Sequence, residues 1–480
     1  MTGPERRRNG PALAIDAEDG TMADLSRRGL IGLGAAALAG TAGVRFGSPR
    51  ATAQDAALPS GPVQIGFWWW GETEAPGSEE WLTAAQAAYS EANPNVTFEN
   101  NLLSTDALLP SYEAAGQARQ GPTIMYLWGG IYTMDPVWKQ WIVPISDLVG
   151  MDEAAHYINS DEATFEGKVW SAAWYLQPSY PLVYNKTAFR EAGLDPENPP
   201  ATWDDFLAAA DAFAAKGLPL IGFGAKDTWG AGRFLLDALV QQVEGVGPVL
   251  QAVTGEASFT EEPYVATLAA WKELVDRKAF PADVASLDMY SGQQLVTQGK
   301  AGLTLITGSE LASYVEAIGA DNAGVMKLPP TGEGPMANQL TSTSQTLAVA
   351  SWASEDQQAV AADFITFLHT PEQLAAYYEA TGVPPADDRF DPGLIDDPLV
   401  REVFAWATEN PAPQLENYIP FDVWFNGFNT AQVQMITGQM ASAEDAAAFT
   451  QGVADKWRQS NRLLLERYKQ WAAEKVAAGA

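Results

Sequence analysis

Several tryptophans of this chain stand where short apolar runs end, which is where predicted buried strands pass into loops. A flat indole ring covers one face of a pyranose, whose C–H bonds lie on its two faces and whose hydroxyl groups surround its edge. Open α/β sheets bind ligands outside the carboxyl ends of their strands, so aromatic residues at such ends are candidates for stacking on a sugar. The candidates are Trp70, Trp128, Trp174, Trp229 and Trp424, the last of which opens a late helix.

Polar residues that could bond the hydroxyl groups round a sugar ring occur in the same stretches. Carboxylates and amides supply the acceptors and donors, and charged acceptors form the stronger hydrogen bonds. Each candidate also has a simpler explanation, because an aromatic residue at a strand end often packs in the core and Glu72 and Asp227 fit a solvated surface. The polar candidates are Glu72, Gln177, Asp227, Glu310, Ser342, Ser344 and Asn426.

The chain has few residues for catalysis by a thiolate or an imidazole. It has no cysteine, and its two histidines, His156 and His369, stand far apart in the sequence. Neither a zinc site built on imidazoles nor a Ser/His or Cys/His nucleophile is expected, and we expect no catalytic residue, metal site or cofactor. The formal net charge of −32 argues against binding to nucleic acid or to anionic lipid, and it fits a neutral or cationic partner.

The N-terminus has the pattern of an export signal. Arg27 and Arg28 precede a Gly- and Ala-rich apolar run, and an Ala-Thr-Ala cleavage site follows at 51–53. This pattern predicts a twin-arginine signal, with translation starting at Met1 or Met22. Because no cysteine follows the apolar run, we expect a protein that is not lipid-anchored and lies free in the periplasm or outside the cell.

The elements that must position these residues alternate between strand and helix. Residues 63–70, 79–92 and 96–98 predict a strand, a helix and a strand, a unit that is typical of a parallel sheet. Further on, the stretch 165–213 holds the clearest patterns of the chain. The repeated alternation of strands and helices predicts an α/β fold.

Within the stretch 165–213, an alternating strand is followed by a polar break that Pro178 and Pro181 bracket, and a second strand is predicted at 182–184. Asn185 is the predicted N-cap of a short helix that ends at Gly193. Thr202 is the predicted N-cap of a longer helix with one buried stripe. The two prolines are candidates for a hinge.

Four motifs of this stretch, in this order, resemble the central signature of extracellular solute-binding proteins, the sugar receptors of ABC importers that include maltose-binding protein. Residues 299–310 resemble the return crossing of that family, and the resemblance covers about 63–457. The motifs are Gly-Lys-Val-Trp at 167–170, Val-Tyr-Asn-Lys-Thr-Ala-Phe at 183–189, Glu-Ala-Gly-Leu-Asp-Pro at 191–196 and Ala-Thr-Trp-Asp-Asp-Phe at 201–206.

The resemblance implies a two-lobed periplasmic-binding-protein fold of type II, in which each lobe is a mixed, mostly parallel sheet flanked by helices and the cleft lies between the lobes. It implies crossings between lobes in the central stretch, near 307–309 and near 343–345. The expected division is a signal and N-terminal extension at 1–53, a linker at 54–61, a first lobe at 62–177 plus 309–343, and a second lobe at 178–308 plus 344–480.

The resemblance also implies a binding protein and not an enzyme. The lobes would close about a hinge on a sugar or oligosaccharide, and the closed monomer would dock transiently on the transmembrane subunits of an ABC permease. Trp70, Trp128, Trp229 and Trp424 would flank the cleft, while Glu310 stands where the family often has an aromatic residue. The alternatives are an exported glycoside hydrolase with a carboxylate pair, or the same receptor fold for a polyol, a polyamine, a peptide or a glycerophosphodiester.

Overall fold

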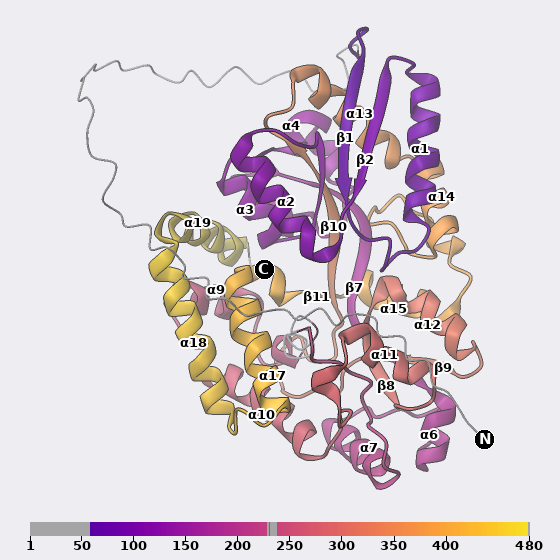
Figure 1. Ribbon diagram of the computed structural model, residues 1–480, viewed down its shortest axis with the longest axis vertical. Helices are drawn as coiled ribbons and strands as arrows, with labels where there is room; N and C mark the ends of the chain where they lie inside the picture. Colours follow the sequence, from indigo (N-terminus) through magenta and orange to yellow (C-terminus); the bar gives the residue numbers. More distant parts are fainter. Residues whose placement is uncertain (1–57, 228–229, 231–237, 479–480) are drawn as a thin grey trace, which may run out of the picture. The chain divides into compact units, whose positions relative to one another are not determined.

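The computed structural model describes residues 58–227, 230 and 238–478. The expected export signal at 1–53 and the predicted site residue Trp229 lie outside these residues. The described part is an α/β structure around one sheet with the strand order β2–β1–β3–β10–β7–β8, in which β4 and β11 pair with β10 and β9 pairs with β7 (Figure 1). This confirms the predicted fold class.

The first strands of the sheet are parallel. β1 (Val63–Trp69) pairs in parallel with β2 (Val96–Leu102) on one side and with β3 (Ile124–Leu127) on the other. α1 (Ser78–Ala92) connects β1 to β2 and buries one side of its surface. The predicted strand–helix–strand unit is therefore confirmed, and it sets the ends of β1 and β3 at the same edge of the sheet.

Two long strands pass through the middle of the sheet. β7 (Ala172–Asn185) and β10 (Thr341–Ala350) are buried along their whole length and pair with each other antiparallel. β10 also pairs antiparallel with β3, and β7 pairs antiparallel with β8 (Leu303–Thr307) and β9 (Ala323–Met326). The sheet is mixed, with parallel pairs around β1 and antiparallel pairs around β7 and β10.

The expected polar break between Pro178 and Pro181 is not present, because β7 continues through both prolines. The prediction of two separate strands was wrong for a physical reason. The pairing with β8 shifts its register between Ser179 and Leu182, and Tyr180 adopts the left-handed region with φ 61°. Such a bulge accommodates proline, which donates no hydrogen bond to a neighbouring strand.

The remaining elements complete the layers round the sheet. The helices of the first part are α2 (Thr105–Ala118), α3 (Ile131–Trp138), α4 (Ile145–Val149), α5 (Met151–Ala154), α6 (Lys186–Ala192), α7 (Trp203–Ala215), α9 (Gly247–Thr254), α10 (Glu262–Asp276) and α11 (Met289–Thr297). Those of the second part are α12 (Leu311–Ile318), α13 (Glu355–Leu368), α14 (Pro371–Thr381), α15 (Pro398–Glu409), α16 (Phe421–Val423), α17 (Thr430–Ile436), α18 (Ala443–Ser460) and α19 (Arg462–Ala478).

Short segments connect these elements. The short strands are β4 (Ile142–Val143), β5 (Thr164–Phe165), β6 (Lys168–Val169) and β11 (Ala412–Pro413). The 3₁₀ turns are η2 (Ser160–Ala163), η3 (Val284–Ser286), η4 (Gly308–Glu310), η5 (Pro392–Leu394) and η6 (Leu415–Tyr418), and η7 (Trp424–Asn429) is a π-helical turn. No helix in the described ranges is both long enough and apolar enough to cross a membrane.

Helices from late in the chain cover the first strands. α13 packs against β1 and β10, and α14 packs against α1. The Tyr89 hydroxyl of α1 donates to Asp363 Oδ2 of α13 at 2.6 Å, and the Tyr89 ring lies 5.1 Å from that of Phe364. Residues 344–381 are thus held by the same elements as residues 63–127.

The expected division into lobes assigns these segments differently. It places 309–343 in the first lobe, although β9 pairs with the second half of β7. It places 344–480 in the second lobe, although β10 pairs with β3 and β4 over 346–350. These contacts favour the opposite assignment for 309–343 and for 344–381, which we propose in its place.

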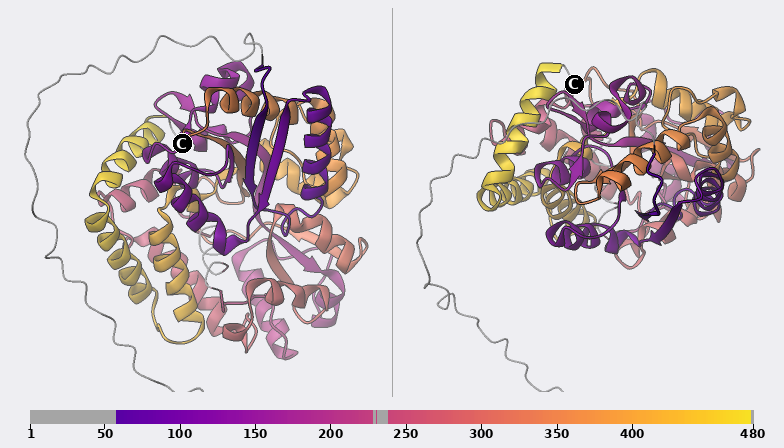
Figure 2. Two further views of the ribbon diagram at one scale, coloured as in Figure 1. Left: turned by 45° about the horizontal axis from the view of Figure 1, so that its top comes forward. Right: turned by 90° about the horizontal axis from the view of Figure 1, so that it is seen from above.

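The C-terminal helices form a layer of their own, seen in yellow beside α9 and α3 in both views of Figure 2. α18 packs against α10 and η7, and α19 packs against α9. The Trp471 ring of α19 stacks on Tyr418 with a centroid separation of 5.4 Å and contacts Trp138 of α3 at 6.0 Å. Aromatic packing therefore fixes the end of the chain to elements from its first third.

The two predicted N-caps of the central stretch are confirmed and allow a paired stability test. The Asn185 side chain accepts hydrogen bonds from the Thr187 and Ala188 backbone nitrogens at 3.0 and 3.1 Å, and its Nδ2 donates to the Val296 carbonyl at 3.0 Å. The Thr202 hydroxyl accepts from the Asp205 backbone nitrogen at 3.2 Å. Asn185 is buried, whereas Thr202 is exposed.

We expect Asn185→Ala to lower the free energy of unfolding by about 2–3 kcal/mol and Thr202→Ala by about 1 kcal/mol, because the first change also removes the buried hydrogen bond from Asn185 to the Val296 carbonyl. Denaturant unfolding followed by tryptophan fluorescence measures both values. Equal losses in the two variants would contradict the role of the Val296 bond.

Candidate ligand-binding site

Six aromatic side chains form a continuous chain of ring contacts at the end of the first strands. The Trp128 ring lies 5.6 Å from Trp70 and 5.3 Å from Tyr132, and the Tyr132 ring lies 6.4 Å from Phe421. Phe421 in turn contacts the next two aromatic residues at 6.2 and 5.0 Å. We call this set the aromatic group; its members are Trp70, Trp128, Tyr132, Phe421, Trp424 and Phe425.

The aromatic group joins three of the predicted tryptophans with three residues that the sequence analysis missed. Trp70, Trp128 and Trp424 were predicted, whereas Tyr132, Phe421 and Phe425 were not. A helical spacing could have found the last two, because Phe421 stands three residues before Trp424 and four before Phe425. Phe421 is 40% exposed, the highest exposed fraction in the group.

Strand pairing and a close backbone contact bring these rings together. β1 and β3 pair in parallel, so Trp70 and Trp128 follow neighbouring strands at the same edge. Gly130, with φ 59°, then lies so close to η6 that a Cβ there would stand 2.2 Å from the Asn417 carbonyl oxygen. This contact sets the segment 415–425, which carries Phe421 and Trp424, against the end of β3.

A buried carboxylate lies directly beneath this turn. Glu162 Oε2 accepts hydrogen bonds from the Thr343 hydroxyl at 2.6 Å and from Asn417 Nδ2 at 2.9 Å. Burial is the main reason why the pKa of Glu162 rises to about 8, and the negative charge of Asp161 adds to it. Glu162 thus links η2, β10 and η6 at the place where the three segments meet.

Three of the predicted binding residues hold a buried polar atom that has no hydrogen-bond partner among the described residues. The atoms are Gln177 Oε1, Trp174 Nε1 and Trp424 Nε1. Gln177 pairs with Thr343 in the ladder of β7 and β10, so it lies beside the residue whose hydroxyl donates to Glu162. Buried polar atoms are normally satisfied, so each of these three unbonded atoms calls for an explanation.

Trp174 itself lies inside the core. Its ring contacts Phe67, Trp69, Trp81 and Tyr377 with centroid separations of 5.9 to 6.3 Å. Core packing, the simpler explanation for an aromatic residue at a strand end, therefore accounts for Trp174.

The predicted carboxylates bond the backbone nitrogens of their own turns and nearby helices. Glu72 accepts from the Gly77 and Glu79 nitrogens, both at 2.8 Å, at the start of α1. Asp227 Oδ1 accepts from the Met289 nitrogen of α11 at 2.8 Å, and Glu310 Oε2 accepts from the Thr307 nitrogen at 2.8 Å in a capping box. Negative charge is favoured at helix N-termini, which gives these side chains a structural role.

Three polar candidates remain, and only one of them lies beside the aromatic group. Ser342 and Ser344 are buried on β10, and each accepts a hydrogen bond from Asn159 Nδ2 at 3.3 Å. Asn426 is exposed on η7, directly after Phe425. Of these three, Asn426 is therefore the one that adjoins the aromatic group.

Two acidic residues stand near Tyr132 and Phe421 of the aromatic group. Asp135 of α3 is half-buried, and its pKa is raised mainly by burial, although its ion pair with Lys139 at 2.7 Å opposes the rise. Asp422 is exposed and lies close enough to Asp135 for its charge to add to that rise. A carboxylate at this position is an acceptor for hydroxyl groups and repels anions.

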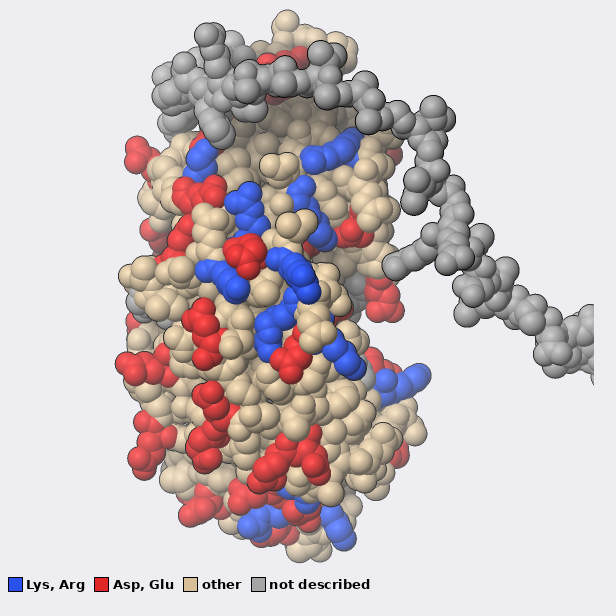
Figure 3. Space-filling view, turned by 90° about the vertical axis from the view of Figure 1, so that its left-hand side faces the viewer, with Lys and Arg blue, Asp and Glu red and all other residues tan. Residues whose placement is uncertain are grey.

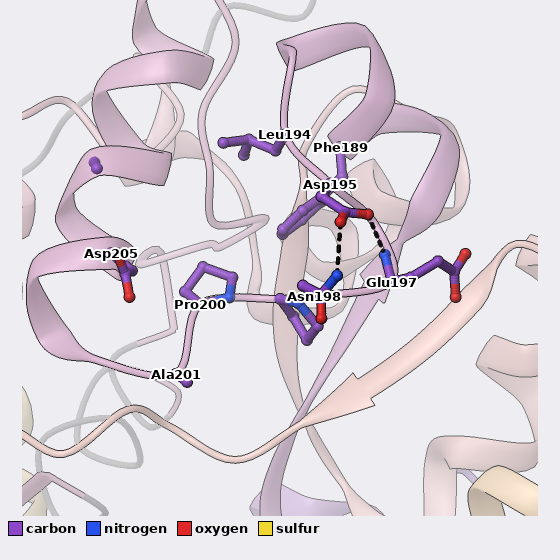
Figure 4. Close-up of a pocket in the computed structure, with 10 residues that line it drawn as sticks. Phe189, Leu194, Asp195, Glu197, Asn198, Pro200, Ala201 and Asp205 are labelled. Atoms are coloured by element: carbon purple, nitrogen blue, oxygen red, sulfur yellow. Dashed lines mark hydrogen bonds between the residues drawn. The ribbon is translucent and has the colours of Figure 1, made fainter.

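An open pocket of about 570 Å³ lies elsewhere, between the turn after α6 and the start of α7 (Figure 4). Asp195 closes this turn by accepting hydrogen bonds from Asn198 Nδ2 at 2.6 Å and from the Glu197 nitrogen at 3.0 Å. None of the predicted binding residues lines it. Over the described ranges, no group of three or more acidic or histidine side chains is arranged to hold a metal ion.

Comparison with known proteins identifies related sequences. A family model described as "Bacterial extracellular solute-binding protein" matches residues 84–401. Among curated proteins, the chain is 27% identical over 220 residues to the sn-glycerol-3-phosphate-binding periplasmic protein UgpB of Shigella dysenteriae, and 27% identical over 216 residues to that of Escherichia coli K12. These matches cover 42% of this chain and 46% of each relative, so the chain spans about half the length of the curated relatives it matches.

Solved structures share the fold over most of the described residues. A chitin oligosaccharide binding protein superimposes with a TM-score of 0.73 at 20% identity, covering 82% of this chain and 98% of its own. A family 1 extracellular solute-binding protein from Bifidobacterium longum subsp. infantis gives a TM-score of 0.63 at 20% identity, with 82% and 100% covered. A cyclic alpha-maltosyl-1,6-maltose binding protein from Arthrobacter globiformis gives 0.60 at 19% identity, with 82% and 99% covered.

The raised pKa of Glu162 predicts a pH-dependent contribution to stability. Between pH 4.5, the ordinary value, and about 8, the folded state keeps the proton while the unfolded state releases it, so this contribution falls as pH rises. Glu162→Gln should remove a slope of at most about 1.4 kcal/mol per pH unit. We therefore expect the variant to gain stability relative to the parent from pH 5 to pH 8, measured by denaturant unfolding.

Glu409→Gln, a change of the same kind on the exposed end of α15, is the matched control and should give a constant difference. A constant difference for Glu162→Gln as well would show that Glu162 is ionised in the folded protein throughout this range.

Proposed function

Because the chain belongs to the bacterial extracellular solute-binding protein family, we propose that it captures a sugar or oligosaccharide outside the cytoplasm and delivers it to an ABC permease. The observation that carries the proposal is the aromatic group, in which six rings meet at the carboxyl ends of β1 and β3. The names of the similar structures, which bind chitin and maltose oligosaccharides, favour the same class of ligand.

The chemistry of the site supports a neutral polyhydroxylated ligand. Exposed and half-buried rings such as Phe421 and Trp128 offer flat apolar surfaces for the faces of a sugar. Gln177 and Trp424 supply a buried acceptor and a buried donor that have no partner among the described residues, and a hydroxyl group both donates and accepts. Asp422 adds an exposed carboxylate beside Phe421. The other predicted residues, including Trp229, remain proposed contacts.

Hinge closure is the proposed mechanism. β7 and β10 are the strands that run through the middle of the sheet. The pairing of β7 with β8 is irregular at Tyr180, and its pairing with β10 shifts register between Ser344 and Thr346. Hinges of periplasmic binding proteins are a few residues that absorb backbone rotation. A ligand that binds the closed state more tightly shifts the population toward it, and no covalent step is needed.

A second ligand class follows from the curated relatives, whose names give sn-glycerol 3-phosphate. A phosphate would call for Arg or Lys at the site. Asp135 and Asp422 stand near Tyr132 and Phe421, and Lys139 is paired to Asp135. We therefore rank the phosphate ester below the sugar. Polyols, polyamines and peptides remain further arms of the test.

We propose that the protein is a binding protein and not a glycoside hydrolase, since the relatives found are binding proteins. We also propose export by the twin-arginine route without a lipid anchor, transient contact with the transmembrane subunits of a permease, a monomeric state and no nucleic acid partner. The formal charge of −32 supports the last of these.

A thermal-shift screen tests the proposed ligand class. Ligand that binds only the folded state raises the melting temperature by mass action, by an amount equivalent to about 2.7 kcal/mol at a hundred times Kd. We expect chito-, malto- or xylo-oligosaccharides to raise it and glycerol 3-phosphate, polyamines and peptides to leave it unchanged. A shift with glycerol 3-phosphate alone would replace the sugar, and steady release of shorter saccharides would replace the receptor with a hydrolase.

The site itself is tested by truncating its rings. Trp128→Ala and Phe421→Ala should each weaken binding of the sugar found in the screen by about 1–3 kcal/mol, because each removes a stacking surface. Trp203→Ala is the matched control, since Trp203 stacks on Phe206 in α7 with a centroid separation of 5.5 Å and has no contact with the aromatic group. Calorimetric affinities that are unchanged in both site variants would place the sugar elsewhere.

A further inference from the structure

Basic side chains gather on one face of this strongly acidic protein. Residues 455–475, the end of α18 and most of α19, contain six basic and three acidic residues, whereas the whole chain contains 28 basic and 60 acidic residues. Figure 3 shows Lys and Arg side chains gathered across the middle of this face, with acidic side chains among them and dominating its lower part. The local sign of charge is therefore opposite to that of the chain.

The inner side of α19 is fixed to the rest of the protein. Tyr468, Trp471 and Lys475 lie on one helical stripe and are buried. The Tyr468 hydroxyl donates to the Tyr418 carbonyl at 2.5 Å, and Lys475 Nζ donates to the Asp161 carbonyl. Because these contacts hold one side of the helix, the opposite side is presented outward in a constant orientation.

The outward side carries cations with weak or no local partners. Lys456 and Arg462 are exposed and form no ion pair within the described part of the chain. Arg467 lies 3.8 Å from Glu166, and Lys469 bonds Glu466 on the same helix at 3.2 Å. Exposed pairs of this kind contribute little, so these charges stay available to a partner.

Arg458 does not belong to this set. Its Nη1 donates to the Ala252 and Val253 carbonyls at the end of α9, both at 3.0 Å, and its other nitrogen pairs with Asp455. Its contacts are structural.

A large apolar side chain stands among these cations. Leu463 is 89% exposed, directly after Arg462 at the start of α19, and Val476 near the end of the same helix is 48% exposed. Exposed cations pair with anionic headgroups, and an exposed apolar side chain beside them can enter the boundary between headgroups and acyl chains. We call Lys456, Arg462, Leu463, Arg467 and Lys469 the α19 face.

We propose that the α19 face docks on the surface of a bilayer that contains anionic lipid. The net charge of −32 predicts repulsion between the whole chain and an anionic bilayer. At 0.1 M salt, however, charges more than about 10 Å from the membrane are screened, so most of the acidic residues contribute little to that repulsion. The cations of the α19 face lie within that distance of a bilayer that it touches, and Lys and Arg near anionic headgroups are attracted individually.

A lipid surface accepts both parts of this face. The headgroups pair with the cations, and the acyl boundary receives Leu463. An acidic surface of a second copy of this chain would complement only the charges. Docking would hold the receptor beside the membrane in a fixed orientation. This proposal rests on the family assignment but not on the identity of the ligand.

Vesicle co-sedimentation of the full mature chain tests the proposal. We expect binding to mixed phosphatidylglycerol and phosphatidylcholine vesicles at low salt, weaker binding at about 0.15 M salt and no binding to pure phosphatidylcholine. The triple variant R462Q/R467Q/K469Q should lose at least about tenfold in partitioning. Leu463→Ser, which removes no charge, should also weaken binding.

The matched control, R190Q/K216Q/K278Q, removes the same charge from exposed residues of α6, the end of α7 and the end of α10, and should bind like the parent. Equal partitioning of the two triple variants, or no binding of the parent at low salt, would overturn the proposal. A dimer in light scattering that the α19 variant loses would assign the face to a second copy instead. Sugar affinity should stay the same in all variants, which separates this test from that of the proposed function.

Discussion

The antiparallel pairing of β7 with β10 is the interaction on which the rest of the structure depends. Both strands are buried along their whole length, and they join β3 on one side to β8 and β9 on the other. At the irregular point of the pairing with β8, the Tyr180 side chain is buried and its hydroxyl is held by a later segment of the chain. The Tyr180 hydroxyl donates to Glu416 Oε2 at 2.8 Å and accepts from Gln414 Nε2 at 3.2 Å, which ties the bulge to the segment before the aromatic group.

The proposed site follows from this arrangement. The segment 414–425 contacts the bulge of β7 through Gln414 and Glu416, the turn after β3 through Asn417, and Tyr132 of α3 through Phe421. A backbone rotation at Tyr180 would therefore shift the segment that carries Phe421 and Trp424. In this way the same few contacts support the sheet, position the stacking surfaces and couple them to the strand that we propose as a hinge.

Charge is distributed unevenly over this framework. Acidic side chains are buried singly where they accept hydrogen bonds, as Glu162 does, or they bond backbone nitrogens at helix starts, as Glu72 does. The basic residues of the α19 face are held on the outside, because the opposite side of the helix, which includes Trp471 and Lys475, is buried. Total charge describes solubility and long-range repulsion, but a partner within one screening length meets only the local residues.

Sequence patterns alone determined the features that depend on near neighbours. The βαβ unit, the caps at Asn185 and Thr202, the left-handed glycine at Gly193 and the family followed from spacing and residue type, because such features are formed within a few positions of the chain. Tertiary structure decided the features that join distant segments. Only the pairing with β8, β9 and β10 turned the proline break into a continuous strand, and only the fold brought Tyr132 and Phe421 into contact. In a sequence, a carboxylate that follows a strand can be either a ligand-binding residue or the cap of a helix N-terminus. Only the position of the next helix in the fold distinguishes these two roles.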